Sequence, residues 1–393
     1  PYAGHYDEST DEVYGRGAVD CKNLLVAELE AVEQLLKDGL KPQRSVLIAV
    51  GFDEEASGVL GARSIAEFLQ NRYGNDSIYA IVDEGSAVVA LEENLYIATP
   101  ITAEKGFVNI EYSVHGHGGH SSVPPDHTTI GIAAELIYLM EQNPFGYSFT
   151  PENPLYDFLV CYAKHSSTLP RDVKSAILEA PFDTKQKAKL VEYVSKDHLV
   201  RELLRTSQAV DIIRGGVKSN ALPEVTSFLV NHRVDINSSV RETVEKDLEH
   251  VKEVAAVFGL GVTLDGMTIV PPTDEGYIEV MTQLPLEPAP QSPTSDSPVW
   301  DLFAGTIQDV FENHFFKDQK DVEFYVAPAL VSGNTDTRYY WSLTENIYRF
   351  VGMPMPADTL KTIHSVNEHI KMSSHLTTIA FVYEYIVNVN ERA

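Results

Sequence analysis

Residues 44–58 read RSVLIAVGFDEEASG, an unbroken apolar run followed at once by three adjacent carboxylates. The apolar run has the length of one strand and predicts a strand buried on both faces of a parallel sheet. Asp53, Glu54 and Glu55 repel one another, and nothing nearby in the sequence neutralises them. They form either a solvated acidic turn or a site where a metal ion supplies the missing positive charge.

Helices alternate with strands around this stretch. Residues 62–74 predict an amphipathic helix, and residues 77–82, SIYAIV, predict a second buried strand that ends at the acids Asp83 and Glu84. This alternation predicts an α/β fold with an open sheet and helices on both faces. Ligands bind such sheets at the carboxyl ends of the strands, where both acidic groups are expected. A helix is also predicted over residues 21–39, with one apolar face made of Leu25, Leu29, Val32 and Leu36.

The pattern changes near residue 106. Residues 107–116 alternate apolar and polar side chains as a half-exposed strand does, and residues 240–259 predict a long helix. A mostly helical insertion is predicted at about 143–210. We therefore predict a catalytic domain in two parts, residues 1–105 and 283–393, interrupted by an inserted α+β domain over residues 106–282.

Two further segments complete the organisation. Residues 262–270, VTLDGMTIV, read as a single strand. Five prolines between residues 285 and 298 predict an extended linker.

Composition excludes several classes of function. The formal net charge of −27 argues against nucleic-acid binding, which depends on Lys and Arg to displace counterions from phosphates. No apolar run approaches the roughly 20 residues that a helix needs to span a bilayer. Cys21 and Cys161 fit neither a disulfide framework nor a zinc-knuckle spacing.

The sequons at Asn75 and Asn237 are glycan acceptors if the protein passes through the secretory pathway.

Acidic and histidine side chains recur where strands end and helices begin. Asp20 opens the first helix, Glu55 and Asp83 follow apolar runs, and His364 precedes the last helix. Taken singly, each has a structural explanation, such as a helix cap or a solvated turn. Taken together, they form a ligand set that suits zinc.

Glu54 and Glu55 divide two tasks between them. Because successive side chains of an extended segment point to opposite sides, a metal-bound Glu55 leaves Glu54 facing the substrate. Zinc lowers the pKa of a bound water to about 7. A carboxylate within hydrogen-bond reach then accepts the proton and passes it to a leaving amine. The pair therefore predicts metal-assisted hydrolysis with Glu54 as general base.

The chain contains, in this order, GRGAVDCKN, GFDEEASGVLGA, IVDEG, GHGGHSSVPP, SNALP, SGNTDTRYY and IHSVNEHI. This set resembles the dinuclear zinc carboxypeptidase and aminoacylase metallopeptidase family, closest to its carboxypeptidase S (Gly-X carboxypeptidase) branch. The resemblance covers nearly the whole chain except the insertion and the proline-rich tract. It implies a zinc-exopeptidase-like catalytic domain, with the inserted domain as a lid and dimerisation surface.

The resemblance implies a role for each matching residue. Asp20 would bridge two Zn²⁺ ions, and Glu54 would be the general base. Glu55 and His364 would bind one ion, and Asp83 would bind the other.

The resemblance also implies how substrate is held. His120 would polarise the scissile carbonyl, in some family members from across a subunit interface. Arginine suits a terminal carboxylate because its planar fork grips both oxygens. The substrate-binding positions carried over are Asn220, Arg233 and Arg338, which would hold that carboxylate, together with Gly333.

These residues imply a zinc carboxypeptidase that hydrolyses the C-terminal peptide bond of short peptides. The alternative is an amidohydrolase acting on N-acyl amino acids, which differs only in the acyl side of its pocket. The resemblance further implies a homodimer through the lid and a place in the vacuole lumen or secretory pathway.

One motif of the family is absent from the expected place. A His-x-Asp motif, whose His would complete the zinc site of Asp83, should precede the loop that residues 1–4 resemble. His5-Tyr6-Asp7 imitates its spacing but follows that loop. The resemblance therefore implies an N-terminally truncated catalytic domain with one incomplete zinc position. It leaves open an inactive form that acts only as a binding protein.

The segment GHGGHSS admits one other interpretation. Ser121 could be the nucleophile of a serine hydrolase, but that chemistry needs a G-x-S-x-G elbow, and the sequence contains none.

Overall fold

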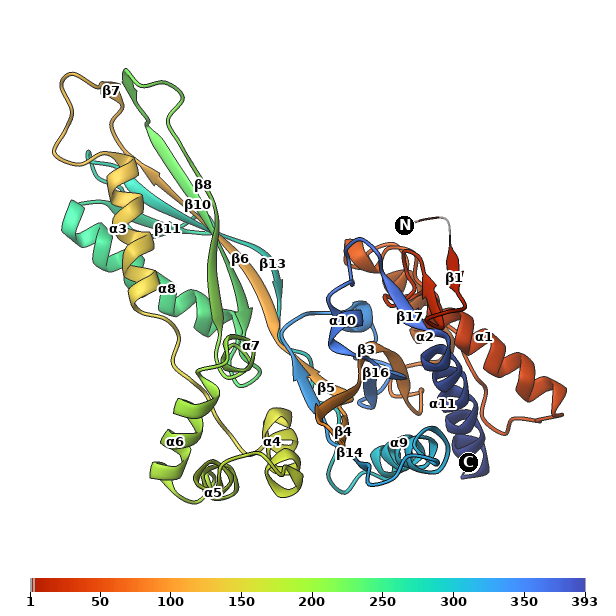
Figure 1. The fold of residues 1–393 in the computed structure, drawn as a ribbon. Coiled ribbons are helices and arrows are strands. Elements are labelled where there is room, and N and C mark those ends of the chain that lie inside the picture. Colours follow the sequence, from red (N-terminus) through yellow and green to blue (C-terminus); the bar gives the residue numbers. More distant parts are fainter. Residues whose placement is uncertain (1, 3, 393) are drawn as a thin grey trace.

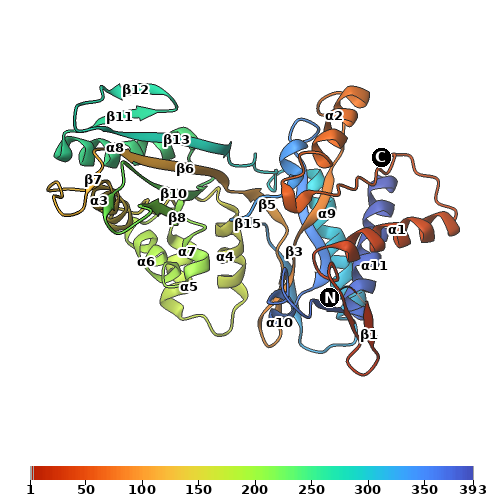
Figure 2. The same cartoon turned by 90° about the horizontal axis from the view of Figure 1, so that it is seen from above.

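The computed structural model describes residue 2 and residues 4–392, which fold around two six-stranded sheets, each with helices of its own (Figure 1). The two sheets lie side by side as separate bodies, and Figure 2 shows this from above. The arrangement confirms the predicted α/β fold, with an open sheet interrupted by an α+β insertion. No helix in the described part of the chain has the length and apolar character to cross a membrane.

The first sheet is mixed, with two parallel strands at its centre and antiparallel neighbours beside them. In spatial order its strands are β14 (Glu323–Val326), β4 (Leu95–Ala98), β3 (Ile81–Glu92), β16 (Ile347–Pro354), β5 (Ile101–Glu104) and β15 (Ala329–Val331). Its helices and turns are α1 (Lys22–Lys37), η1 (Glu54–Ala56), α2 (Ala62–Tyr73), α9 (Pro298–Asp309), η2 (Val310–Phe315), η3 (Asp336–Tyr339), α10 (Ala357–Leu360) and α11 (Met372–Glu391). A small sheet beside it contains β1 (His5–Asp7), β2 (Glu12–Tyr14) and β17 (His369–Lys371).

Strand β16 is buried along its length and carries the core of the first sheet. Phe350 packs in an aromatic cluster with Phe303 of α9 and Phe381 of α11. Met353 belongs to a second cluster that includes Leu24 of α1. Burial on both faces explains why β16 is mostly apolar, with Arg349 as its one buried charge.

The second sheet has helices α3 and α8 in its hydrophobic core. Its strands alternate buried and partly exposed residues, as the pattern over 107–116 predicts. In spatial order they are β12 (Met267–Val270), β11 (Gly261–Leu264), β13 (Tyr277–Leu286), β6 (Gly106–His115), β10 (Val225–Val234) and β8 (Ser207–Gly215). The two helices are α3 (Thr129–Gln142) and α8 (Val240–Phe258), and the short ribbon at the far end is β7 (Gly119–His120) with β9 (Ala221–Leu222).

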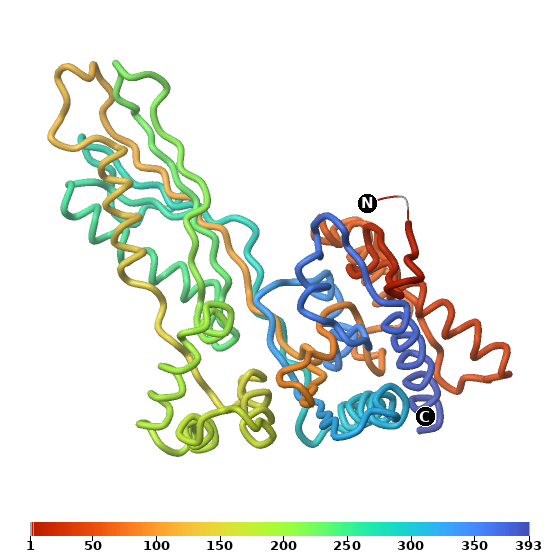
Figure 3. The backbone as a smooth tube through the Cα atoms, in the orientation of Figure 1, coloured from red at the N-terminus to blue at the C-terminus, as the bar shows by residue number. Residues whose placement is uncertain are grey.

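The predicted helical insertion is present and has its own small core. It contains α4 (Pro154–His165), α5 (Arg171–Glu179), α6 (Thr184–Val194) and α7 (His198–Arg201). Figure 3 traces it as a compact unit below the second sheet, and α4 also contacts β15 of the first sheet. Glu92 at the end of β3 accepts hydrogen bonds from Ser166, Ser167 and Thr168, which ties the insertion to the first sheet.

The prediction of a buried strand at residues 44–50 is wrong. Residues 45–50 have no regular secondary structure and are exposed, and no strand of the described residues pairs with them. A strand needs a neighbour to satisfy its backbone N–H and C=O groups. Apolar composition alone therefore did not produce one.

The prediction that a strand ends at Asp83 and Glu84 is also wrong. Strand β3 begins at Ile81 and continues to Glu92, so both acids lie inside it. The register with β16 shifts at this point, because Asp83 pairs with Arg349 and the next paired residue is Ser86. Such a bulge re-aims the side chains around it.

Helix α1 forms where it was predicted, but it buries a different face. Leu29 and Leu36 are more than half exposed, at 52% and 67%. Because α1 packs against α11, the buried face is the one with small residues that permit close approach. It consists of Leu24, Ala27, Ala31 and Leu35.

Residues 262–270 form a hairpin instead of a single strand. Asp265 and Gly266 between β11 and β12 both have positive φ, at 48° and 78°. An Asp-Gly pair adopts this geometry readily, and it turns the chain back on itself. The proline-rich tract is extended as predicted, but it packs on the first sheet, where Ser292 N–H donates to Thr102 O at 2.9 Å.

Buried charges mark the crossing from β5 to β6. Arg349 Nε lies 3.0 Å from Glu104 Oε1, and both side chains are only 1% exposed. Lys105 is fully buried, and its Nζ donates to the carbonyl oxygens of Glu202 and Arg205 at 2.7 and 2.6 Å. These contacts fasten β16 and the insertion to the crossing.

We expect Arg349→Met to lower the free energy of unfolding by about 3–5 kcal/mol, because Glu104 would remain buried without its partner. Urea unfolding followed by circular dichroism measures the change. Arg63→Gln is the matched control, because it removes an ion pair with Glu67 whose side chains are 58% and 60% exposed. We expect about 1 kcal/mol or less from the control, and equal effects would contradict the assignment.

Candidate active site

Three segments far apart in the chain meet beside the first sheet and bring Asp20, Glu55 and His364 together. His364 Nε2 lies 2.6 Å from Asp20 Oδ2 and 3.0 Å from Glu55 Oε1. One ligand atom from each residue lies within 4.8 Å of the others. Two carboxylates and an imidazole at this separation fit the donor set that zinc prefers.

A second group shares Asp20 and includes Cys21 and Glu84. Their candidate ligand atoms also lie within 4.8 Å of one another, and Cys21 Sγ donates to Glu84 Oε2 at 2.7 Å. Sequence reasoning assigned no role to Cys21 or Glu84. The one sequence feature that could have indicated Glu84 is its position next to Asp83. Neighbouring side chains of a strand point to opposite faces, and the sequence does not show which of the two faces Asp20.

Asp83 lies outside both groups. Its Oδ1 accepts a hydrogen bond from the backbone N–H of Glu84 at 2.8 Å. Burial raises the pKa of Asp83, while the Glu84 amide and the nearby Arg349 guanidinium act in the opposite direction. Its role as a metal ligand stays a prediction.

The adjacent acids Asp53, Glu54 and Glu55 each have different surroundings. Asp53 accepts hydrogen bonds from Leu60 N–H and Gly61 N–H at 2.7 and 2.8 Å, immediately before α2. Glu54 and Glu55 lie on the 3-10 turn η1, so the extended backbone assumed for them is wrong. Consecutive residues of such a turn still point in different directions. Glu55 contacts His364, whereas Glu54 lies near Asp336.

Asp20, Glu54, Glu55, Glu84 and Asp336 form an acidic cluster, and several of its carboxylates are half-buried. Burial, followed by repulsion from Asp336 and Glu55, raises the pKa of Glu54 to about 7. Burial is also the main cause that raises the pKa of Glu84 to about 8 and that of Asp336 to about 6. Carboxylates that resist ionisation in this way indicate a place where a cation would be stabilising.

Two arginines lie near each other, Arg233 on β10 of the second sheet and Arg338 on η3 beside Asp336. Arg233 of β10 donates from Nη1 to Asn334 Oδ1 at 3.0 Å, which joins the second sheet to the loop after β15. Arg338 of η3 donates from Nε to Thr335 O at 3.1 Å. Burial and then repulsion from Arg338 lower the pKa of Arg233, so the two guanidinium groups are near each other. Gly333 lies beside Asn334 in the same loop, and the nearest atom to a Cβ placed there would be Val331 Cγ2, at 4.0 Å.

His120 lies elsewhere, on β7, and Asn220 directly precedes β9, with which β7 pairs at the far end of the second sheet (Figure 1). They are close to each other, because the Ser121 N–H donates to Asn220 O at 3.4 Å. His120 is exposed, and its Nδ1 lies 2.8 Å from Ser122 Oγ. Within one chain, the structure does not bring these residues to the acidic cluster.

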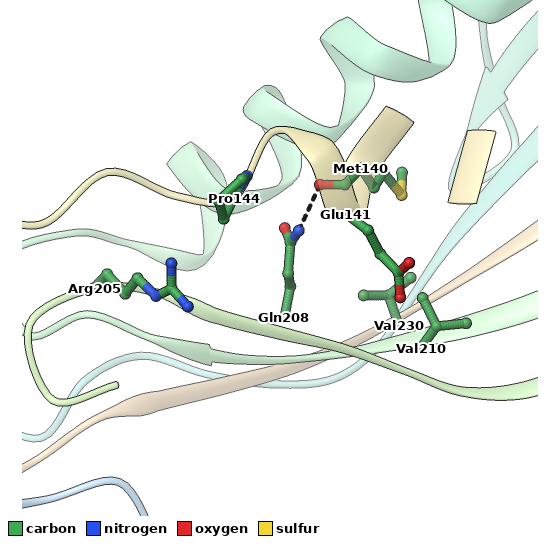
Figure 4. A pocket seen from close by; sticks show the side chains of 7 residues that line it. All are labelled: Met140, Glu141, Pro144, Arg205, Gln208, Val210 and Val230. Atoms are coloured by element: carbon green, nitrogen blue, oxygen red, sulfur yellow. Dashed lines mark hydrogen bonds between the residues drawn. The ribbon is translucent and has the colours of Figure 1, made fainter. Parts of the chain in front are cut away.

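A cavity of about 290 Å³ lies between α3 and the strands β8 and β10 of the second sheet (Figure 4). Gln208 in this cavity donates to Met140 O at 2.6 Å, and Arg205 is already paired with Glu202. None of the predicted site residues lines it: its lining is Met140, Glu141, Pro144, Arg205, Gln208, Val210 and Val230.

Comparison with known proteins yields matches over nearly the whole chain. Residues 1–388 match the model of peptidase family M20/M25/M40. The chain is 58% identical to carboxypeptidase S of Saccharomyces cerevisiae over 394 residues, covering 100% of this chain and 68% of that protein. It is 31% identical to N-fatty-acyl-amino acid synthase/hydrolase PM20D1 of Bos taurus, covering 96% of this chain and 68% of that protein.

A solved structure has the same fold. It is the M20 family metallo-carboxypeptidase Sso-CP2 from Sulfolobus solfataricus, with a TM-score of 0.56 and 16% identity. The match covers 96% of this chain and 77% of that one.

We expect the metal-free chain to lose stability as the pH rises from about 5 to 8. Glu54, Asp336 and Glu84 have folded pKa values of about 7, 6 and 8. In the unfolded chain these acids release their protons near pH 4. The folded state therefore binds more protons in this window, so the free energy of unfolding falls with rising pH until all three are ionised.

His364 changes stability in the same direction. Slight burial lowers its pKa, but the Glu55 and Asp20 carboxylates outweigh this and raise it. Stability from the charged imidazole is therefore present at low pH and lost as the pH rises. Thermal unfolding in a chelator between pH 5 and 8.5 measures the trend. Glu54→Gln should flatten it, and Glu8→Gln, at an exposed turn, should not. A midpoint that rises with pH would contradict the prediction.

Proposed function

The chain belongs to peptidase family M20/M25/M40, and we propose that its acidic cluster hydrolyses the C-terminal peptide bond of short peptides. The family match and the 58% identity to carboxypeptidase S make it a metallo-carboxypeptidase. The observation that carries the residue assignment is the meeting of Asp20, Glu55 and His364 beside the half-buried Glu54. These residues are the cofactor site and the base of the proposed reaction.

Zn²⁺ is the proposed metal, with Glu55 and His364 on one ion and Asp20 shared between two. The second ion would be held by Asp20 and by a carboxylate from β3, either the predicted Asp83 or Glu84 beside it. Bound zinc would polarise the substrate carbonyl and lower the pKa of a bound water to about 7.

Glu54 is the proposed general base. It neighbours Glu55 on η1, and burial raises the pKa of its carboxyl to about 7 in the metal-free chain. A base whose pKa lies near neutral pH can accept a proton from the attacking water and return it to the leaving amine. Asp53 is occupied by the two backbone amides before α2, so it is not available for this task.

The substrate's terminal carboxylate is the proposed partner of Arg338 and Arg233. Both lie near the crossing between the two sheets. Because the two guanidinium groups repel each other, an anion bound between them would be stabilising. Gly333 would let the substrate approach the loop backbone, because a side chain is absent there. This arrangement would select peptides with a free C-terminus.

His120 is proposed to act from a second copy of the chain, since β7, which carries it, lies at the far end of the second sheet (Figure 1). The edge strand β8 supports a homodimer through the second sheet, because Ile212 and Ile213 on it are 43% and 56% exposed. Asn220 lies close to His120, so the second copy would bring both residues to the active site together. We further propose the inserted unit, residues 106–282, as the lid between residues 1–105 and 283–393.

A place in the vacuole lumen or secretory pathway is also proposed. Its support is the likeness to carboxypeptidase S together with two sequons whose asparagines, Asn75 and Asn237, are both exposed.

Hydrolysis of N-acyl amino acids is the second candidate, favoured by the 31% identity to N-fatty-acyl-amino acid synthase/hydrolase. Both substrates present the same terminal carboxylate and scissile amide. Turnover of N-acyl amino acids without turnover of blocked dipeptides would reverse the order of the two candidates.

We expect Glu54→Gln to keep the bound metal and to lower kcat by about 100- to 10,000-fold, because only the proton acceptor is lost. Metal content by atomic emission and initial rates on a blocked dipeptide measure the two effects. Glu8→Gln is the control and should retain full activity. A fully active Glu54→Gln enzyme would refute the proposed mechanism.

We expect Arg338→Met to raise KM for free-acid dipeptides by about 10- to 100-fold, because a charge-assisted hydrogen bond to the terminal carboxylate is lost. We expect C-terminally amidated dipeptides to be poor substrates of both the wild type and Arg338→Met. The ratio of the rate on free-acid dipeptides to the rate on amidated ones should therefore be smaller in the variant. Steady-state rates on matched acid and amide substrates measure it. An unchanged acid-to-amide ratio would place the carboxylate elsewhere.

A further inference from the structure

Glu368 is a buried carboxylate with no part in the proposed reaction. It lies directly before β17, four residues after His364 in the same connection, and is only 3% exposed. A charged side chain at this depth needs strong partners, because removal from water otherwise costs several kcal/mol. Its partners all come from the loop that leads to Asp20.

The Oε1 atom of Glu368 accepts three backbone hydrogen bonds from this loop. The donors are the N–H groups of Gly17, Val19 and Asp20, at 3.0, 2.9 and 3.1 Å. Gly17 has φ of +87°, a conformation that favours glycine and that helps successive amides turn toward one anion. The loop therefore wraps around the carboxylate as it would around a bound anion.

The same connection is held to the loop by three further contacts. Arg16 Nε lies 3.2 Å from Glu368 Oε2, and Arg16 Nη2 donates to Ser365 O at 2.8 Å. The Gly15 N–H donates to Glu368 O at 3.0 Å, which continues the pairing of β2 with β17. One loop ends in Asp20 and the other carries His364, so Glu368 joins the two segments that supply these side chains.

We propose that Glu368 is a positioning residue that holds Asp20 and His364 at the separation a metal ion requires. The proposal rests on the proposed function for the identity of the metal site. Glu368 does not touch the side chains of Asp20 or His364 and acts through the backbone amide of Asp20. Residues that orient metal ligands in this way typically contribute about 10- to 100-fold to metal affinity.

The central test is the zinc affinity of Glu368→Gln, measured by competition with a chromophoric chelator. Gln has nearly the same shape, but it is neutral and places an NH₂ donor among the donors that now face the carboxylate. We expect the zinc dissociation constant to rise about 10- to 100-fold. Glu8→Gln makes the same change of charge at an exposed turn and should stay within twofold of the wild type. Glu368→Asp, which keeps the charge but shortens the reach, serves if the Gln variant does not fold.

A second readout separates positioning from general stability. Hydrogen exchange of the amides at residues 17–20 should speed up in Glu368→Gln, while exchange in α8 of the second sheet should not change. A variant with a lower unfolding temperature but an unchanged zinc dissociation constant would overturn the proposal. Wild-type protein that binds zinc without cleaving peptides would refute only the proposed function. Wild-type protein that binds no zinc would overturn both.

Discussion

Negative charge without a matching cation is the constraint around which the first sheet is arranged. Glu54, Glu84 and Asp336 are drawn into half-buried surroundings, where their pKa values rise to about 7, 8 and 6. Most soluble proteins avoid such crowding, because each unpaired carboxylate weakens the folded state. Here His364 supplies only part of the positive charge, through contacts with Asp20 and Glu55. A peptidase that binds metal ions turns this cost into affinity for the cofactor.

Other charged groups near the cluster have partners of opposite charge within the protein, and they hold its framework. The Arg349 guanidinium pairs with Glu104 at the crossing between the sheets, and Glu368 is surrounded by three backbone amides and Arg16. Both carboxylates are almost wholly buried. The first sheet thus contains acids that are paired within the protein, such as Glu104 and Glu368, and acids whose pKa values burial raises, such as Glu54 and Glu84.

Local pattern and chemistry made much of the fold and site predictable. Helices α1, α2 and α8 lie where periodicity placed them, and Asp20, Glu55 and His364 meet although they are distant in sequence. The failures share one cause. Residues 46–50 are apolar but have no paired neighbour among the described strands, and α1 buries the face that packs against α11. In both cases the outcome depends on a partner that periodicity does not reveal.

The sequence alone predicted an α/β fold from its periodicity and metal-assisted hydrolysis from its acidic and histidine side chains, because ligand chemistry is a property of the side chains. Their arrangement came from long-range packing. The bulge between β3 and β16 turned Glu84 toward Asp20, the 3-10 turn η1 separated Glu55 from Glu54, and β10 carried Arg233 toward Arg338. Glu368 shows the difference most clearly. In the sequence it is one acid among many, and only the folded chain wraps the amides of residues 17–20 around it.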